Sequence, residues 1–358
     1  MKRHNTKKLT RAAVAAAVIT SASASAEVVL TENLSLTGFL GISASNVDKD
    51  AYGGTASSSD SSAEIDEFEV DFLFSQDKIY AQVDLNYLGG PGDVELEQAH
   101  IGYAVSDSFS LNAGKFLSCI GFETFDMNGL YQYSAAASTA GIYPGHHTGL
   151  AGVYSGETFG VYGSVVDGTW SADGDPDNLG YEVQVFTSPA EGLTIKLGYA
   201  TEAFEKKLIP GKLIPAVMES YADANDGYII KEREIVPGRI EPGSTTPGFD
   251  KAMINLWVSY EVDALTVAAE YSSLEDFDKK GDDGDAYMLM GNYAFTDTFN
   301  ATLRFAHVDA DWAEIDEFTI SPRFVISDSV SVITEYRNRD FAGGGDEDLL
   351  AARVLYTF

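Results

Sequence analysis

The sequence predicts an all-β protein: a closed antiparallel transmembrane β-barrel of about sixteen strands, with its third external loop folded inward. Three observations predict this class. Apolar and polar residues alternate with a period of two in sixteen short runs. Short turns and longer loops alternate between those runs. No apolar run after residue 26 approaches the roughly 18 residues of a transmembrane helix. Strands with one face toward lipid and one toward water produce this alternation.

The first 26 residues differ from the rest of the chain. Basic residues at positions 2, 3, 7, 8 and 11 precede a short apolar run at 12–19, and small residues occupy 24–26. This order is typical of a cleaved secretory signal peptide. We therefore predict a signal peptide at 1–26 and an outer-membrane β-barrel domain at 27–358.

The charge balance excludes one class of partner. The chain has 55 acidic residues against 23 Lys and Arg, with a net charge of −32. Phosphate backbones are bound by Lys and Arg, so no nucleic-acid partner is expected. Cys119 is the only cysteine, which rules out an internal disulfide in this exported chain.

Nine of the runs precede the longest loop. In the first run, Leu36 and Ile42 lie on the face opposite Thr37, and in the second Phe68 and Phe72 oppose a row of carboxylates. The nine predicted strands are 34–44, 67–74, 79–87, 99–105, 109–113, 146–154, 159–165, 179–185 and 193–199. A Pro- and Gly-rich stretch at about 201–251 follows, and we interpret it as a loop.

Seven runs follow that loop and show the same period. Val267 and Tyr271 oppose Glu270, for example. The predicted strands are 252–260, 265–271, 287–295, 299–305, 317–324, 330–337 and 350–358. The last run ends on Tyr356 and Phe358, which resembles the C-terminal signal read by the barrel assembly machinery.

The connections indicate a membrane barrel. Short connections follow every even-numbered run, and the odd-numbered runs lead into longer loops, among them a Ser-, Gly- and Asp-rich stretch at 45–63. Short periplasmic turns, longer external loops and an even strand number are the plan of outer-membrane barrels. A soluble sandwich would also alternate, but it would not readily give sixteen runs with this asymmetry.

If the apolar face contacts lipid, the polar face lines a wet lumen rather than a packed core. The candidate lumen carboxylates are Glu67, Glu69, Asp71, Asp84, Glu182, Glu270 and Glu335. Four arginines come one per strand on the last four strands: Arg304, Arg323, Arg337 and Arg353. These arginines could set up a transverse field across the pore. They could equally pair with Glu317 and Glu335 and stiffen the wall, and the two roles can coexist.

The segment 113–149 breaks the alternation for about thirty residues between the fifth and sixth runs. Counting turns and loops makes it the third external loop. By analogy with general porins, it would fold inward and narrow the pore. Glu123 and Asp126 are its candidate constriction carboxylates, and they would face the four arginines.

Catalysis has few candidate groups. The histidines after residue 26 are His100, His146, His147 and His307, and none stands in a recognisable nucleophile–base arrangement. Adjacent strand residues point to opposite faces, so His146 and His147 do not suggest a metal site. We expect no enzyme activity, no cofactor and no metal.

Several short motifs in the middle of the chain resemble those of a known family. They are Gly114-Lys115-Phe116, Gly121-Phe122-Glu123, Tyr133-Ser134 and His147-Thr148-Gly149. Together they resemble the central block of the OmpL-like β-barrel porin family, with the best match over 111–167. The stretch 118–120 departs from the Pro-containing sequence expected there. The resemblance implies a bacterial outer-membrane channel.

The expected function is passive diffusion of small hydrophilic solutes and ions across the outer membrane, with a cation preference from the acidic balance. The alternative is a structural or adhesive barrel with an occluded pore and the 201–251 loop as its binding surface. Expected partners are outer-membrane lipid and lipopolysaccharide, the barrel assembly machinery and, by analogy, two further copies in a homotrimer.

Overall fold

The computed structural model describes residues 27–51, 56–89, 92, 94–171, 179–204, 248–277 and 279–358, and only the backbone of six short strands between 205 and 247. The predicted signal peptide at 1–26 lies outside these residues. The chain divides into two units, one of Met1–Ala203 with Asp250–Phe358 and one of Phe204–Phe249. We describe each by itself.

The first unit is a closed antiparallel barrel of sixteen strands, which confirms the predicted class. One additional short strand, β1 (Val28–Thr31), pairs with the first strand of the ring. The ring consists of β2 (Leu34–Lys49), β3 (Ser58–Gln76), β4 (Ile79–Tyr87), β5 (Glu95–Ser106), β6 (Phe109–Leu117), β7 (His146–Ser155), β8 (Phe159–Val166), β9 (Gly180–Ala190), β10 (Leu193–Phe204), β17 (Phe249–Val262), β18 (Leu265–Glu275), β19 (Gly284–Thr296), β20 (Phe299–Ala310), β21 (Ala313–Ser327), β22 (Val330–Phe341) and β23 (Asp346–Thr357). In the part of the chain described, no helix is long and apolar enough to cross a membrane.

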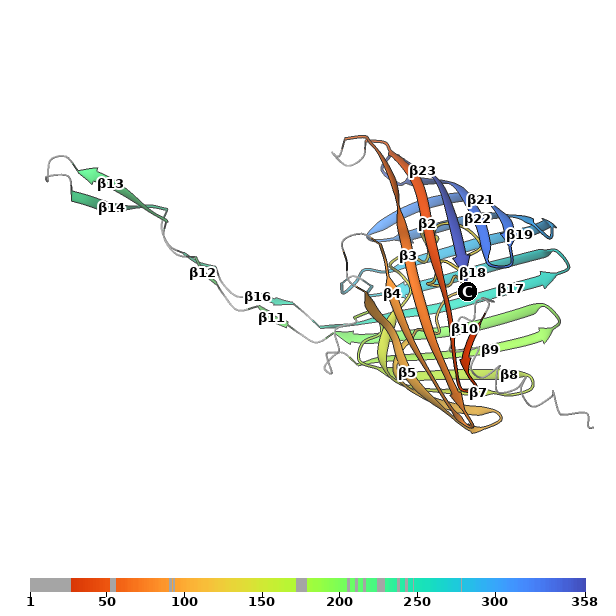
Figure 1. Cartoon of the computed structure of the whole chain (residues 1–358). Coiled ribbons are helices and arrows are strands. Elements are labelled where there is room, and N and C mark those ends of the chain that lie inside the picture. Colours follow the sequence, from red (N-terminus) through yellow and green to blue (C-terminus); the bar gives the residue numbers. More distant parts are fainter. Residues whose placement is uncertain are drawn as a thin grey trace, which may run out of the picture. The chain divides into compact units, whose positions relative to one another are not determined.

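The ring closes where the last strand meets the first. β23 pairs with β2 over eleven register positions, from Phe39↔Thr357 to Lys49↔Glu347, and the two strands lie side by side in Figure 1. Gly38 and Phe358 exchange two backbone hydrogen bonds of 2.9 and 3.0 Å. The C-terminal residue is therefore itself part of the closure.

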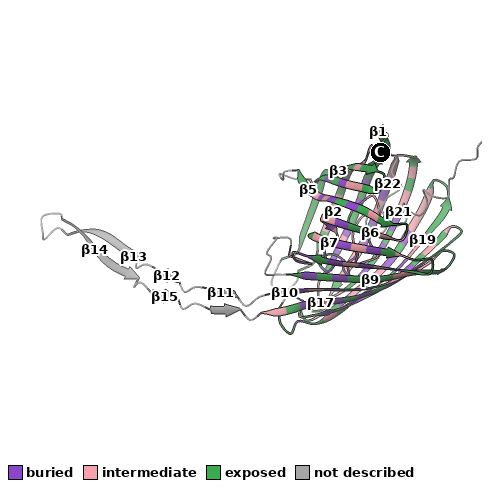
Figure 2. Cartoon of the chain, turned by 90° about the horizontal axis from the view of Figure 1, so that it is seen from below, coloured by how far each residue is buried: buried purple, intermediate pink, exposed green. Residues whose placement is uncertain are grey.

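The alternation assigns the two faces of each strand as predicted. Exposed and buried residues alternate along the strands in Figure 2, and the exposed positions hold apolar side chains such as Tyr181, Val183 and Leu350. The neighbouring inward positions hold buried polar residues such as Glu182 and Gln184. A closed ring satisfies the strand backbone within lipid, where no water can do so.

The turns at one end of the barrel are all short. They occupy 77–78, 107–108, 156–158, 191–192, 263–264, 297–298 and 328–329, at the seven places predicted. Asp77 and Asp263 adopt φ values of 55° and 50°, and Gly192 adopts 74°. Two-residue hairpin turns favour this left-handed conformation because it matches the twist of the strands.

The connections at the other end differ from the prediction in two places. The loop predicted at 45–63 is largely strand, because β2 continues to Lys49 and β3 begins at Ser58. The connection between β20 and β21 is a two-residue turn at 311–312. Side-chain pairs such as Asn46 with Ser61, at 3.0 Å, extend the ladder without apolar alternation. A hairpin that is polar on both faces carries no period-two signal, so the sequence pattern missed it.

The second unit also differs from the predicted loop. Its six strands pair in sequence-symmetric order, β11 (Lys207–Ile209) with β16 (Ser244–Thr246), β12 (Lys212–Ile214) with β15 (Arg239–Glu241), and β13 (Val217–Asp223) with β14 (Ile229–Val236). The three strand pairs between Lys207 and Thr246 therefore stand where the sequence predicted a loop, and residues 201–204 and 249–251 belong to the ring strands β10 and β17.

Substitution of Gly38 tests the closure. A Cβ at Gly38 would lie 2.3 Å from the Glu69 carbonyl oxygen and 2.7 Å from the Phe358 ring. Because backbone cannot yield there, Gly38→Ala should lower the free energy of unfolding by about 1–3 kcal/mol. Urea unfolding of the barrel in lipid vesicles measures this.

Gly291 provides a matched control. It also lies on the outward face of a ring strand, and a Cβ there would meet no atom within 4 Å. Gly291→Ala should leave stability unchanged or raise it slightly. Equal effects of the two substitutions would contradict the proposed role of the β2–β23 contact.

Candidate pore constriction and its charged walls

The irregular segment of the barrel unit runs from 118 to 145, between β6 and β7. It is shorter at both ends than the predicted 113–149, because the flanking strands extend further. A hydrogen bond of 3.1 Å from the Ser118 amide to the Gly145 carbonyl joins its ends. Two tight turns over 136–143 give it a defined local structure, with the Tyr143 amide bound to the Thr139 carbonyl at 3.1 Å. We call residues 118–145 the constriction segment, after the role that the sequence predicts for them.

Glycine allows the segment to fold onto its own aromatic anchor. Gly121 has a φ of 107°, and a Cβ there would lie 2.2 Å from the Tyr143 ring. The Tyr143 hydroxyl accepts a bond of 3.2 Å from the Phe122 amide and donates to the Glu270 carboxylate. The two ends of the segment thus meet at one carboxylate of β18.

Wall carboxylates satisfy the backbone of the segment. Glu270 accepts hydrogen bonds from the Phe122 amide at 3.1 Å and from Asn255 at 2.7 Å. Glu335 on β22 accepts from the amides of Tyr133 at 2.9 Å and Ser134 at 3.1 Å. Both residues are predicted lumen carboxylates, and both bind the segment.

Glu182 on β9 also binds the segment. It accepts a hydrogen bond from the Ser118 hydroxyl and another of 3.1 Å from Ser164. Its second oxygen lies 3.3 Å from His147 Nε2. Glu182 and His147 are fully buried, so the third predicted lumen carboxylate also fastens the start of the segment to the wall.

Arg304 on β20 is the central ion-pairing residue of the wall. Its guanidinium lies 2.7 Å from Glu123 of the segment and 2.9 Å from Glu317 of β21. It also donates to the Ser134 carbonyl at 2.7 Å. Glu123 further accepts from the Ala136 amide at 2.8 Å. The structure thus brings together Arg304 and Glu123, two predicted site residues, as a buried pair.

The other predicted arginines make separate contacts. Arg323 donates to the Leu130 carbonyl of the segment. Arg337 pairs with Glu347 at 2.6 Å. Arg353 pairs with Asp66 at 2.7 Å and stacks 4.2 Å over the Tyr133 ring.

Of the two expected pairings, only the one with Glu317 occurs in the structure. Arg304 pairs with it, and Arg339 on β22 lies 2.7 Å from its second oxygen. Glu335 holds segment amides instead.

Apolar packing between segment and wall was not expected from the sequence. Met127 packs with Phe39, Ile333 and Leu355, which point inward from β2, β22 and β23. A second cluster joins Ile120, Ile142 and Tyr143 to the inward strand residues Met253 and Leu274 and to Phe277 in the connection after β18. The lumen is therefore not entirely wet: part of it is a packed core. Phe39, Met253 and Ile333 alternate with the outward apolar residues of their strands. They therefore stand at positions where the pattern predicts polar side chains, and the sequence prediction overlooked them for that reason.

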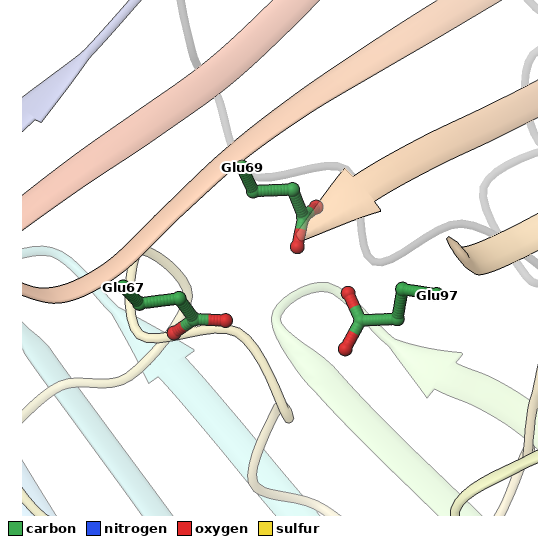
Figure 3. Close-up of side chains that lie close together, drawn as sticks. All are labelled: Glu67, Glu69 and Glu97. Carbon is green, nitrogen blue, oxygen red and sulfur yellow. The ribbon is translucent and has the colours of Figure 1, made fainter. Parts of the chain in front are cut away.

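The remaining predicted carboxylates gather on one wall, and Asp126 is influenced by them. Glu67 and Glu69 of β3 and Glu97 of β5 direct their carboxylates toward one another in Figure 3. Burial, and then the charges of Glu97 and Glu67, raise the pKa of Asp126 well above its usual range. The two predicted constriction carboxylates thus have different surroundings.

An open space lies next to this acidic wall. A cavity of about 440 Å³ is lined by Asp66, Glu67 and Arg353 from the wall and by Met127 and Tyr133 from the segment. Water and small polar solutes could occupy such a space. It lies between groups of both charge signs.

A family comparison identifies the class of protein. The sequence profile of the family described as "Putative beta-barrel porin-2, OmpL-like" matches residues 35–348. The chain belongs to this porin family. The resemblance predicted from the central motifs is confirmed, and the porin is an outer-membrane protein. A search of curated proteins gives no match.

Solved structures with the same fold are outer-membrane channels and proteins. OmpT of Vibrio cholerae is 12% identical, with a TM-score of 0.58 over 93% of this porin and 100% of that chain. The channel DcaP of Acinetobacter baumannii is 12% identical, with a TM-score of 0.61 over 91% and 97%. An anion-selective porin from Comamonas acidovorans is 10% identical, with a TM-score of 0.58 over 91% and 100%. At these identities the likeness shows the fold alone.

Sequence reasoning missed several charged partners in the porin. Asp66, Glu97, Arg339 and Glu347 all take part in the contacts around the lumen. Asp66 lies next to a register shift between β2 and β3. A shift of this kind changes the facing of side chains, and no local sequence signal reveals it.

Removal of Arg304 tests the buried ion pairs. Arg304→Met leaves Glu123 without its cation, and an unpaired buried charge typically costs about 3–5 kcal/mol. The free energy of unfolding in lipid vesicles should fall by that amount. Lys279→Met is the control: the Lys279 side chain is 77% exposed, so its pair with Asp282 should contribute less than about 1 kcal/mol. Equal losses would contradict the central role of Arg304.

Proposed function

We propose that this porin is a non-enzymatic channel for passive diffusion of small hydrophilic solutes and ions, narrowed by the constriction segment. The observation that carries the proposal is the set of bonds between the segment and inward side chains of the ring. Glu182, Glu270, Arg304, Glu335 and Arg353 all bind it, from five different strands. A loop held from so many sides fits a fixed internal constriction better than an external flap.

The acidic wall supports a cation preference. In the described part of the chain, Glu67, Glu69, Asp71, Asp84 and Asp126 form no ion pair with Lys or Arg. The arginines of β20, β22 and β23 are instead neutralised by carboxylates. An uncompensated cluster of carboxylates in a channel wall attracts cations. Because the anion-selective porin of Comamonas acidovorans shares the fold, the fold by itself does not determine whether a channel prefers cations or anions.

One observation favours the alternative of a structural or adhesive barrel with an occluded pore. The apolar clusters around Met127 and Tyr143 fill lumen volume that a wide pore would leave open. Well-folded protein without measurable conductance would favour that alternative.

The partner proposals rest on the outer surface and the C-terminus. The exposed apolar side chains of the ring strands fit outer-membrane lipid. The rim at the end that carries the longer loops would face lipopolysaccharide. Tyr356 and Phe358 stack at 5.7 Å in the closing strand, where the barrel assembly machinery could read them. Association into a homotrimer remains an analogy with general porins.

Ion selectivity tests the proposed channel. In a planar bilayer with a KCl gradient, the reversal potential of the porin should indicate cation preference. Asp126→Asn should shift it toward zero, because one pore carboxylate is lost. This variant is easier to interpret than Glu123→Gln, because Glu123→Gln would also remove an ion-pair partner of Arg304.

Asp328→Asn is the matched control, in the short turn between β21 and β22. It should leave the reversal potential unchanged. Strong anion selectivity of the unmodified porin would contradict the cation preference. Unchanged selectivity in Asp126→Asn would mean that the segment does not contribute charge to the conduction path.

The pH dependence of selectivity follows from Asp126. Burial and neighbouring carboxylates raise the pKa of Asp126. Asp126 therefore becomes neutral at a higher pH than an ordinary Asp, whose pKa is about 3.9. Cation preference should therefore decline as the pH falls, and the decline should begin above the range expected for free carboxylates. Reversal potentials across a pH series measure this. Asp126→Asn should flatten the upper part of the curve.

A further inference from the structure

Three carboxylates lie together on two neighbouring strands of the acidic wall. Glu69 and Asp71 belong to β3 and Asp84 to β4, and ligand oxygens of the three lie within 4.8 Å of one another. Asp71 and Asp84 are direct cross-strand partners. Like charges directly opposite each other destabilise a sheet, so this arrangement calls for a compensating positive charge.

Neutral donors hold one oxygen of each aspartate. The Thr37 hydroxyl donates to Asp71 Oδ2 at 2.7 Å. The side-chain amides of Gln82 and Gln98 donate to Asp84 Oδ2 at 2.8 and 2.6 Å. The other oxygens, Asp71 Oδ1 and Asp84 Oδ1, are buried without a hydrogen-bond partner. Donors of this kind orient a carboxylate and leave its second oxygen available to a ligand.

Glu69 completes the set. Its side chain is 3% exposed and Asp84 is 1% exposed, and Glu69 Oε2 is also buried without a partner. A buried charged oxygen without a partner costs free energy, on the order of 1–3 kcal/mol or more. Among the residues that the structure describes, no Lys or Arg forms an ion pair with any of the three. None of the described basic residues supplies the missing positive charge.

The spacing fits one calcium ion. Calcium is bound by oxygen ligands at about 2.3–2.6 Å, so two ligands of one ion lie at most roughly 5 Å apart. The ligand oxygens of the three residues lie within 4.8 Å of one another, which satisfies this bound. Magnesium demands near-ideal octahedral geometry and usually keeps several waters, so a buried cluster of three carboxylates suits calcium better. We propose that Glu69, Asp71 and Asp84 form a Ca²⁺ site on the inner wall, with water completing the coordination shell.

A second group of carboxylates borders the proposed calcium site but is not part of it. Glu67, Glu69 and Glu97 also converge, as Figure 3 shows. Glu67 is held by Asn86 at 2.7 Å, and within this group only Glu69 is among the described residues with a buried, unpartnered oxygen. This group shares Glu69 with the calcium site and extends its negative field toward the constriction segment.

Direct binding measurements test the site. Full-length porin in detergent, treated with EGTA and dialysed, is titrated with CaCl₂ in a calorimeter. We expect saturable binding near one ion per chain. Loss of a partner that only orients a ligand already weakens metal binding about 10- to 100-fold. Glu69→Gln and Asp84→Asn should therefore weaken binding at least about tenfold.

Asp60→Asn is the matched control, because Asp60 lies on the same strand but is exposed and outside the cluster. It should bind Ca²⁺ as the unmodified porin does. A heat-modifiable band on unboiled gels confirms that each variant is folded. If a variant fails to fold, the unmodified porin still decides: Ca²⁺ should raise its unfolding temperature, and EGTA should reverse the rise.

Three results would overturn the proposal: no saturable Ca²⁺ binding by the unmodified porin, unchanged binding in folded Glu69→Gln, or tighter binding of Mg²⁺ than of Ca²⁺. The first would mean that protons shared between carboxyl groups replace a metal. Binding is measured without a membrane, so its outcome is independent of whether the porin conducts.

Discussion

Every peptide group that faces the hydrocarbon of the membrane must find its partner inside the protein, and the rest of this structure depends on that constraint. An open sheet would leave two unpaired edges. The ring removes both, because β23 pairs with β2 through to the last residue, Phe358. Closure in turn fixes which side of each strand faces inward, and so it creates the enclosed space in which the buried ion pairs of Arg304 lie.

A related constraint applies to the constriction segment. It lacks regular structure, so its amides and carbonyls need partners from elsewhere. Glu270, Glu335 and Glu182 provide acceptors, and Arg304 and Arg353 provide donors. The wall charges thus have a structural role before any role in conduction. Apolar side chains of the segment add packing against inward residues such as Met253 and Phe39.

Charge is divided unevenly around the lumen as a consequence. The arginines of β20, β22 and β23 are used in ion pairs, most completely at Arg304. The carboxylates of β3 and β4 keep unsatisfied oxygens. This division is what connects the proposed cation preference with the proposed calcium site: both depend on negative charge that the protein leaves uncompensated.

The sequence by itself determined the barrel. Period-two alternation fixes the face of each residue, and turn residues such as Asp263 and Gly192 mark where strands reverse, so the sixteen strands and seven short turns were predictable. The family was also readable from short motifs, because those residues are adjacent in the chain. The extension of β2 and β3 past their predicted ends was not predictable, since a hairpin that is polar on both faces has no period.

Only the tertiary structure decided which charges meet. Glu123 and Arg304 are 181 positions apart, and nothing local distinguishes that pair from the many other acid–base combinations. Glu69, Asp71 and Asp84 could be assigned to the lumen from alternation. Their convergence depends on the register between β3 and β4, which the alternation alone does not fix. The physical reason is that alternation along one strand decides only which face each side chain is on. The distance between two side chains depends on how neighbouring strands are aligned and on where a loop folds.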